Sequence, residues 1–443
     1  MAIKLKDSYI IVLLSLMFIA VIAIPKVFFV ELDHGDEFSD AGVLMSGKNF
    51  VKLGFIKCKF LPVIEPHLLE PKGHYTHAPP MSDITNGLLR KIFKTDSLRF
   101  FRGASLFFSL LNLLFWYLFV RKFSNSFLVG FLAALFYFTN PFFIYGADSL
   151  YQNAYSDFLR AFIFYLFLYI LISPRVRKIG LIILFMVFAL LTSYTFEYIA
   201  YLGLFLLAFR YFYVSRGQKL SLKYIFMVFL APICVIALHF MQNAWYFGSF
   251  GLAYQDLKNI AIERITHSSD SPFGAVTLAN WWNYVLLRYI SLVFIFDFYI
   301  LIPFALFFFM LYQNLDAQNK NESRRIFFLC LLLLACGISW YAIFPSHALA
   351  HTFILFLPRH LVPAAALAFA CCCYIMYHFV RKQNPQNVFG KLALAAIIII
   401  ISVSGLLKSE LPITKEALSG AGEFLVFKHC LLSIRATPRD KAG

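Results

Sequence analysis

Residues 127–138 read FLVGFLAALFYF, a run of apolar and aromatic residues with no charge among them. A helix built from this run has no polar stripe with which to face water, so its expected surroundings are lipid. The whole chain shares this character, because 61% of its 443 residues are hydrophobic, only 14% are charged and the mean hydropathy is +0.74. Soluble domains carry about 25% charged residues. The composition therefore excludes a soluble protein and predicts an all-α polytopic membrane protein.

The apolar runs are sufficient for about 11 transmembrane helices, since a helix needs about 20 mainly apolar residues to cross a bilayer core. The first run, near residues 10–30, exceeds the apolar core of a signal peptide, which holds about 7 to 15 residues, and we expect it to be retained. The shortest connection falls near residues 194–198, where Glu197 is the single charge. The predicted spans lie near residues 10–30, 100–120, 127–146, 158–173, 179–194, 198–214, 224–243, 285–312, 326–344, 354–380 and 392–408.

Basic residues mark the ends of these predicted spans. The net charge is +16, but Lys and Arg are spread in small clusters along the chain, which argues against a nucleic-acid partner. The positive-inside rule places these clusters and the N-terminus in the cytoplasm. We expect a transmembrane domain over residues 1–408, with a folded first outer loop over 31–99 and a second large outer loop over 244–284. A tail over 409–443 would then lie outside.

The densest acidic segment follows the first predicted span. Asp33, Asp36 and Glu37 lie within a few residues of one another, beside His34. A carboxylate next to a hydrophobic wall is partly desolvated, which raises its pKa toward the range of a general base. The alternative is a solvated charge cluster that ends a helix, an arrangement common in membrane proteins. The sequence at this point leaves both interpretations open.

Two other segments place polar residues at predicted outer boundaries. Tyr75 and His77 precede Pro79 and Pro80, whose rings hold the backbone extended and would present both side chains on a stiff segment. The alternative is an ordinary turn. Arg359 lies at the outer end of a late span in a polar cluster, which in a membrane indicates function. Its alternative is an arginine that reaches from the span end to lipid headgroups.

In their order along the chain, these features resemble the GT-C superfamily of membrane glycosyltransferases, which use lipid-phosphate sugars. The resemblance begins with an outward span that ends in Asp-Glu, a long first outer loop with an aromatic residue before Pro-Pro, and a next span opened by an arginine. It continues with a fourth span opened by Tyr-Ser-Asp and a late Leu-Pro-Arg-His motif. The matching residues are Asp36, Glu37, Tyr75, Pro79, Pro80, Arg102, Tyr155 to Asp157, and Leu357 to Pro363.

A closer resemblance is to the prophage-encoded, serotype-converting glucosyltransferases that modify bacterial O-antigen, which share the length class, the Phe-rich spans and the large outer loops. It implies a hexosyltransferase of the bacterial inner membrane with a periplasmic active site. The donor would be bactoprenyl-phosphate glucose, a polyprenyl-phosphate sugar, and the acceptor lipid-linked O-antigen. Membrane lipids, a flippase and a donor synthase from the same cluster would be further partners. We expect no cofactor and no metal ion, because arginine can neutralise a single anchored phosphate.

The chemistry of such a transfer assigns roles to the candidate residues. A sugar hydroxyl needs a carboxylate to accept its proton, and Asp36, with Glu37 beside it, is the predicted catalytic base. The departing phosphate needs fixed cations, which predicts Arg102, Arg359 and His360 as donor phosphate-binding residues. The predicted substrate-binding residues are Asp33, Tyr75, His77, Tyr155, Asp157 and His351.

Other functional classes remain as alternatives. A lipid or solute transporter, or a flippase, would place its acids at broken helices near the bilayer midplane, whereas most acids here are predicted at the outer face. The internal repeats typical of secondary transporters are not found in the sequence. An O-antigen polymerase or ligase would carry its largest outer loop late in the chain. A GT-C transferase that acts on lipid A or on protein is a further alternative.

Overall fold

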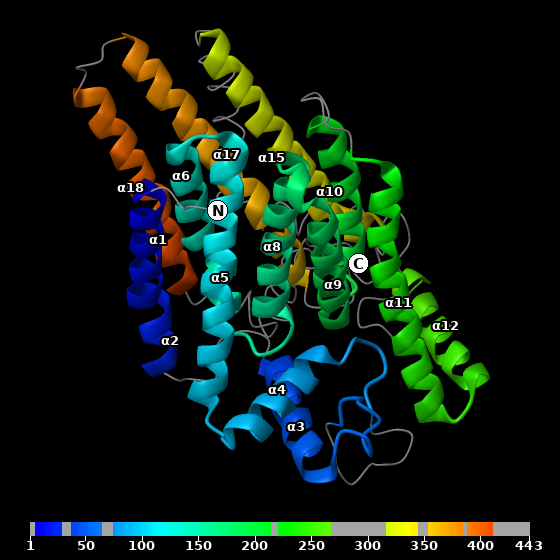
Figure 1. The fold of residues 1–443 in the computed structure, drawn as a ribbon. Coiled ribbons are helices and arrows are strands. Elements are labelled where there is room, and N and C mark those ends of the chain that lie inside the picture. The colour runs from blue at the N-terminus through cyan, green and yellow to red at the C-terminus, as the bar shows by residue number, and fades with distance from the viewer. Residues whose placement is uncertain are drawn as a thin grey trace, which may run out of the picture.

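The computed structural model of the protein describes residues 5–28, 37–63, 74–213, 220–266, 316–343, 353–383 and 388–410. These residues are mainly helical and contain no β-strand, apart from a bridge between Val63 and His74 (Figure 1). The helices are α1 (Leu5–Phe18), η1 (Ile19–Ala23), α2 (Ile24–Phe28), α3 (Glu37–Leu53), α4 (Met81–Phe93), α5 (Leu98–Ser124), α6 (Phe127–Phe138), α7 (Pro141–Gly146), α8 (Asn153–Ile172), η2 (Pro174–Val176), α9 (Arg177–Tyr194), α10 (Tyr198–Tyr213), α11 (Leu222–Phe247), α12 (Phe250–Thr266), α15 (Ala317–Ile343), α17 (Phe353–Gln383) and α18 (Val388–Glu410).

Within the described residues, six helical segments are long and apolar enough to cross a bilayer, and three shorter helices are also apolar. This confirms the prediction of a helical, membrane-embedded chain. The predicted span near residues 285–312 lies outside the described residues, so the count of about 11 stays a prediction. The six segments are Leu5–Phe28, Leu98–Ser124, Asn153–Ile172, Pro174–Tyr194, Leu222–Phe247 and Arg359–Lys382.

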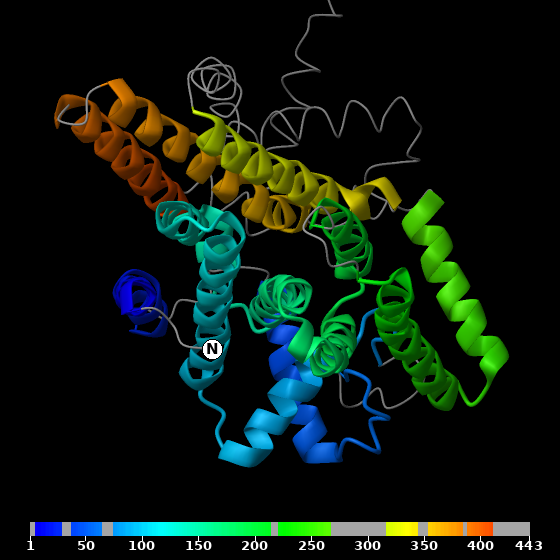
Figure 2. The same cartoon turned by 45° about the horizontal axis from the view of Figure 1, so that its top comes forward.

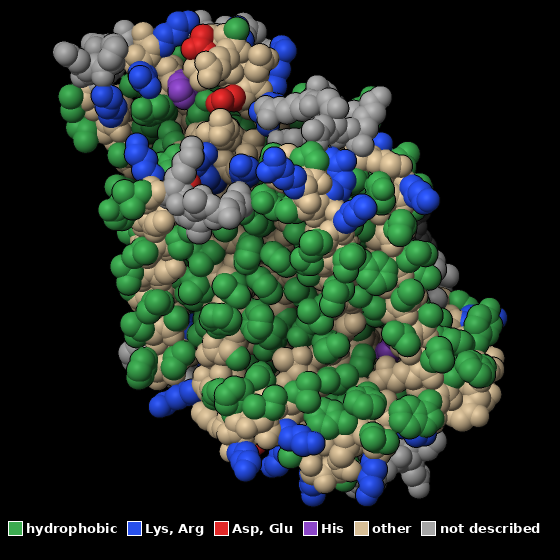
Figure 3. Space-filling view, viewed as in Figure 1, with side chains coloured by type: hydrophobic (Ala, Val, Ile, Leu, Met, Phe, Trp, Pro, Cys, Tyr) green, Lys and Arg blue, Asp and Glu red, His purple; other side chains and the backbone are tan. Residues whose placement is uncertain are grey.

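The surface carries an apolar band between two basic rims. On the face seen in Figure 3, hydrophobic side chains cover a broad middle zone, and Lys and Arg gather above and below it. Arg121 and Lys122 stand in the last turn of α5, and Arg381 and Lys382 in the last turn of α17. We call this the far end of the bundle. The opposite end, where α3 and α4 lie, is the loop end (Figure 1).

The predicted span near residues 127–146 is broken in the structure. α6 ends at Phe138, and α7 begins at Pro141. Asn140 between them has an extended backbone, and its side-chain oxygen accepts a hydrogen bond of 3.0 Å from the backbone N–H of Phe142. The prediction of one continuous helix is wrong here, because this local cap and the proline at the first helical position start a new helix within the apolar run.

Two other boundaries can be compared with the prediction. The short connection near residues 194–198 separates two helices, since α9 ends at Tyr194 and α10 begins at Tyr198. Thr195 between them has an extended backbone. At the second predicted loop, α11 continues past residue 244 to Phe247, and α12 then occupies Phe250–Thr266. The described part of this loop is therefore helical.

The bundle packs around aromatic rings that lie between α5, α8 and α10. The ring centroids of Phe119 and Phe164 are 5.4 Å apart, and those of Phe164 and Phe205 are 4.2 Å apart. Trp116 of α5 donates a hydrogen bond of 3.2 Å from Nε1 to the backbone oxygen of Ala133 in α6. Such packing is what holds helices together in lipid, where the hydrophobic effect between spans is weak. Figures 1 and 2 show α15, α17 and α18 as a layer along one side of this core.

The segment predicted as the first outer loop contains α3 and α4, which pack against each other at the loop end. The approach is close at Gly47, where an added Cβ would overlap with Oδ1 of Asn86. α4 is tied to the bundle because the Thr85 Oγ1 and the Tyr194 hydroxyl of α9 share a hydrogen bond of 2.8 Å. The two loop helices are therefore fixed to the ends of the spans.

Candidate functional site

One carboxyl group joins the first loop helix to the start of α8. Asp40, in the first turn of α3, accepts hydrogen bonds at Oδ1 from the backbone N–H groups of Leu150 and Tyr151, at 2.9 and 3.0 Å. The Ser149 hydroxyl donates a third bond of 3.2 Å to the same oxygen. All three donors belong to the α7–α8 turn, residues 147–152. The turn is therefore held by a residue more than a hundred positions earlier in the chain.

The surroundings of Asp40 give its carboxyl group the character of a base that works near neutral pH. Burial raises the pKa of Asp40 to about 7, and the nearby Asp148 carboxylate also raises it. The hydrogen bonds from Tyr151, Leu150 and Ser149 lower this pKa and oppose the shift. A group with a pKa near the working pH can both accept and release a proton, which is the requirement for a general base.

A cavity of about 420 Å³ opens beside Asp40 at the loop end. Three cations from three helices line it, namely Lys48 of α3, Arg90 of α4 and Arg102 of α5. An anionic group with an apolar attachment suits this lining, because the cations can meet charge while the apolar walls cover hydrocarbon. The remaining lining residues are Asp40, Ala41, Leu44, Met45, Asp96, Leu98 and Leu150.

Acidic neighbours hold two of these cations in place. Arg102 is buried, and its Nε lies 3.7 Å from Oδ2 of Asp148, which also pairs with Lys26 of α2. Arg90 donates from Nε to Oδ1 of Asn86 at 2.9 Å and pairs with Asp96. Cations fixed in this way need little rearrangement to meet a charge that develops nearby, which is the arrangement that favours electrostatic catalysis.

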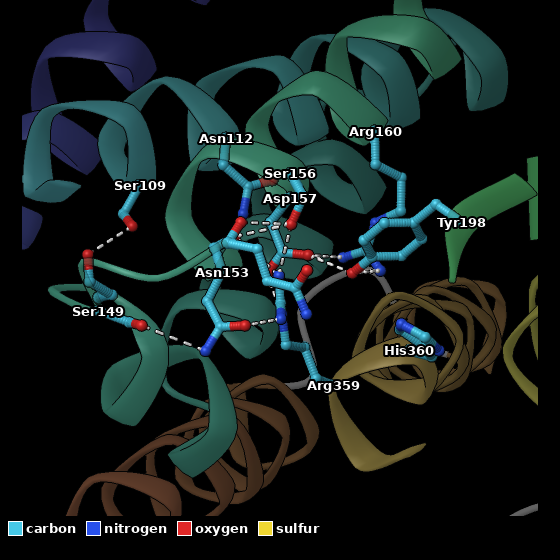
Figure 4. Close-up of polar contacts among 12 residues, drawn as sticks. Ser109, Asn112, Ser149, Asn153, Ser156, Asp157, Arg160, Tyr198, Arg359 and His360 are labelled. Carbon is cyan, nitrogen blue, oxygen red and sulfur yellow. Dashed lines mark hydrogen bonds and ion pairs between the residues drawn. The ribbon is translucent and has the colours of Figure 1, made fainter. Parts of the chain in front are cut away.

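The polar contacts continue from the α7–α8 turn to the late helix α17 (Figure 4). The Asn153 Nδ2 donates to the Ser149 hydroxyl at 3.4 Å, and its Oδ1 accepts from Nη1 of Arg359. Arg359 also donates to the Asn153 backbone oxygen at 2.7 Å, to the Ser156 hydroxyl at 2.9 Å and from Nε to Oδ2 of Asp157 at 2.8 Å. Arg359 is thus bound to the first turns of α8.

A second buried arginine shares the same carboxylate. Arg160 lies with Nη2 3.1 Å from Oδ1 of Asp157, and the Tyr198 hydroxyl of α10 donates to that oxygen at 2.6 Å. Arg160 also donates to the hydroxyls of Tyr198 and Tyr137, both at 3.1 Å. A buried charge is tolerated only when such partners replace its water. The Asp157 carboxylate is therefore engaged by groups of the protein itself.

This charged cluster begins one turn into α8 and extends to the middle of α5, because the Tyr137 hydroxyl, which accepts from Arg160, also accepts a hydrogen bond of 3.1 Å from Nδ2 of Asn112. Asp157 follows the first residue of α8, Asn153, by four positions, which at 1.5 Å per residue is about 6 Å along the helix. Glu197 lies in the turn before α10, and its Oε2 is 3.9 Å from Nε2 of His360. The His360 ring also rests against Tyr198, with centroids 4.7 Å apart.

The structure brings most of the described candidate residues into one region. Arg102 lines the cavity, while Asp157, Arg359 and His360 belong to the buried cluster. Tyr155 lies beside that cluster on α8 and stacks on Tyr194, with ring centroids 5.2 Å apart. These residues come from α5, α8 and α17, so folding brings together positions that are up to about 260 residues apart. Their roles in binding substrate stay predictions.

Tyr75 and His77 flank Thr76, which contacts α11 and α12, and lie apart from this cluster. The Thr76 backbone oxygen between them is 3.0 Å from Nε2 of His239 on α11, and the His77 Nε2 is 4.0 Å from Oδ1 of Asp256 on α12. Neither residue lines the cavity. Asp33, Asp36 and His351 lie outside the described residues, and Glu37 opens α3 without a described side chain.

Several residues of the site escape the sequence analysis. Asp40 follows Asp36 by four positions in the sequence, but only the fold shows the contact of Asp40 with the α7–α8 turn. Arg160 follows Asp157 by three positions, a spacing at which helical residues can pair. The sequence around Arg90 contains no spacing or motif that would identify it as a site residue. Among the described residues, no three His, Cys, Asp or Glu side chains gather as metal ligands would.

No protein-family model matches this chain, and no curated protein matches it. The resemblance to GT-C enzymes therefore stays a prediction. What the fold adds is a cavity lined by three cations and by a carboxyl group with a raised pKa, next to the ends of apolar spans.

We expect Asp157→Asn to destabilise the protein strongly, because it leaves two buried arginines without their carboxylate. Breaking one partner of a buried ion pair costs about 3–5 kcal/mol. Thermal unfolding of the purified protein in detergent measures the loss. Asp96→Asn is the matched control, because Asp96 pairs with Arg90 from an exposed position and exposed pairs contribute little. Equal midpoints for the two variants would contradict a supporting role for Asp157.

Proposed function

We propose that this protein is a membrane glycosyltransferase. In this proposal it transfers a sugar, glucose by the resemblance, from a polyprenyl phosphate to lipid-linked O-antigen at the periplasmic face of the bacterial inner membrane. The observation that carries the proposal is the cavity at the loop end. There Asp40 and the cations Lys48, Arg90 and Arg102 line one space beside the membrane-spanning helices.

The cations suit the leaving group of this reaction. As the acceptor hydroxyl oxygen bonds to the anomeric carbon, the bond from that carbon to the phosphate oxygen breaks, and its electron pair leaves with the polyprenyl phosphate. Arg102 and Arg90, already held by acids, would stabilise that charge, and Lys48 would add a third cation. The apolar lining residues would contact the first part of the lipid.

The hydroxyl proton passes to a carboxylate, for which two residues compete. The resemblance assigns this role to Asp36, which directly precedes α3 in the chain. The described geometry supports Asp40, because it lines the cavity and its pKa is raised to about 7. The two residues are four positions apart, so either carboxyl group belongs to the same acidic segment at the start of α3.

Arg359 has a different part in this proposal from the one that the sequence predicts. Its guanidinium group donates to Asp157, Ser156 and Asn153, and so is occupied by protein groups. We propose that it positions the α7–α8 turn, because Asn153 also bonds to Ser149, which in turn bonds to Asp40. Its effect on the phosphate would then be indirect.

A transporter or flippase is the second candidate, and the buried cluster of Asp157, Arg160 and Arg359 is the observation that favours it. Charged residues inside a membrane bundle often mark a transport path. Transporter sites lie near the midplane, and Arg160 of this cluster is connected through Tyr137 to Asn112 at the middle of α5. If radiolabelled donor crosses the proteoliposome membrane and no label is transferred to glycolipid, the protein is a transporter.

The test of the proposed function uses purified protein with radiolabelled bactoprenyl-phosphate glucose and extracted lipid-linked O-antigen. We expect label in the glycolipid, and a loss of about 10² to 10⁴ in rate when the general base is removed. Asp36→Asn and Asp40→Asn are the two variants. Asp7→Asn is the control, because Asp7 bonds to Tyr117 and Arg121 at the far end. Absence of transfer by the unchanged protein would reject the proposal.

The pH profile separates Asp36 from Asp40. If Asp40 is the base, kcat/KM rises as the pH passes through about 7, because only its ionised form accepts a proton. Asp40→Asn should abolish this step. Asp83→Asn is the control, since burial also raises the pKa of Asp83 to about 7 but Asp83 does not line the cavity. An unchanged step in Asp40→Asn would return the role to Asp36.

The raised pKa of Asp40 also has a consequence for stability, with the opposite sign. The folded protein holds this proton more tightly than the unfolded chain, where the carboxyl pKa is 3.8. The contribution of Asp40 to the free energy of unfolding therefore falls as the pH rises from about 4 to about 7. Activity and stability should respond to this group in opposite directions.

We expect Arg102→Ala to raise the KM for the polyprenyl-phosphate donor, because it removes a fixed cation from the cavity. Arg102→Lys should retain part of the affinity, since the charge survives while the planar guanidinium is lost. Arg99→Ala is the matched control on the same helix, as Arg99 is exposed and does not line the cavity. Equal donor KM values for Arg102→Ala and Arg99→Ala would exclude Arg102 from phosphate binding.

A further inference from the structure

One side of the helix α12 contacts the bundle. Ala253 and Ile260 are buried, and α12 packs against α11. On the same side, Asp256 accepts a hydrogen bond of 3.0 Å at Oδ2 from the Thr76 hydroxyl of the first loop. α12 therefore binds the span α11 and, through Asp256, the loop segment that leads into α4.

The second side is an exposed apolar stripe. Phe250, Tyr254 and Leu257 are separated by four and three positions, so they lie along one side of the helix. Their exposed fractions are 64%, 60% and 41%. The rest of the exposed surface is mixed, because Gln255, Lys258 and Asn259 are exposed beside the apolar Leu252 and Ile262, whose exposed fractions are 57% and 46%. A helix that exposes both large apolar and polar side chains suits the membrane interface, where hydrocarbon and headgroups are both within reach.

The position of α12 in the chain supports the same surroundings. α11 has 26 residues, or about 39 Å at 1.5 Å per residue, which exceeds the bilayer core of about 30 Å. Its last turns, with the half-exposed Trp245, therefore reach the headgroup region. Gly248 has a φ of +67° and turns the chain, so that α12 begins at Phe250 at the same level. Figures 1 and 2 place α12 at the edge of the molecule.

We propose that α12 is an interfacial helix whose stripe of Phe250, Tyr254 and Leu257 lies among the lipids of the leaflet at the loop end. Tyrosine suits this depth, since its ring can lie in hydrocarbon while its hydroxyl reaches the headgroups. Asp256 then fastens the first loop, through Thr76, to a helix that lipid holds in place. The proposal concerns a membrane contact and does not depend on sugar transfer.

The contacts around Thr76 show how firmly this loop segment is held. Its backbone oxygen lies 3.0 Å from Nε2 of His239 and accepts a bond of 3.3 Å from Nδ2 of Asn243, both on α11. Lys59, earlier in the loop, donates to the backbone oxygens of Trp245 and Tyr246 in the last turn of α11. The α11–α12 pair thus binds the loop at several points, and lipid contact by α12 would hold the loop near the membrane surface.

Spin labels on single cysteines test the proposal in the full-length protein reconstituted in nanodiscs. The background replaces Cys234, which is exposed, and Cys430 by alanine. Tyr254→Cys and Leu257→Cys probe the apolar stripe, and Gln255→Cys and Lys258→Cys are matched controls on the same helix. Collision rates with oxygen, which concentrates in lipid, and with a water-soluble nickel chelate are measured for each label.

At positions 254 and 257 we expect oxygen collisions to exceed nickel collisions, with the opposite order at 255 and 258. Equal nickel access at 254 and 258 would overturn the proposal, because the stripe would then face water. Low access to both reagents at 254 and 257 would also overturn it, since another protein segment or a second copy would cover the stripe. Two stripe positions are used so that a local disturbance at Tyr254 does not decide the result.

Discussion

The carboxylate of Asp157 is the interaction on which the polar part of this bundle depends. It is the shared partner of Arg160, three positions away on α8, and of Arg359, two hundred positions away on α17. In a membrane bundle, a buried guanidinium group without a carboxylate would be costly. The pairing therefore fixes where α17 meets α8, and Tyr198 brings α10 to the same point through its hydrogen bond.

From this point the polar contacts pass outward to the first loop. Arg359 binds Asn153, Asn153 binds Ser149, and Ser149 binds Asp40, so each link fixes the next. A carboxyl group held by two backbone N–H groups and a hydroxyl has little freedom. The cavity beside Asp40 is thus shaped by residues from α3, α4 and α5, and its position is set by the buried cluster.

Part of this arrangement can be predicted from the sequence, because apolar runs and their interruptions act locally. The helical membrane fold and the break before Tyr198 follow from such runs. The helix break at Asn140 cannot be predicted in this way, because a single side-chain cap starts a new helix within an apolar run. Arg359 is recognisable in the sequence as a charge on an apolar span. Its pairing with Asp157 is a tertiary contact, which the sequence does not predict. The same holds for Asp40, whose raised pKa comes from burial.

The distribution of polar and aromatic residues along α8 bears on what the bundle can do. Asp157 lies in the second turn of α8, whereas Phe164, two turns further, packs against Phe119 of α5 and Phe205 of α10. In the part of the chain that the structure describes, the centre of this interface is filled by aromatic rings. A polar solute that crossed here would have to separate them and give up its hydrogen bonds. These rings therefore separate the charged cluster from the far end of the bundle.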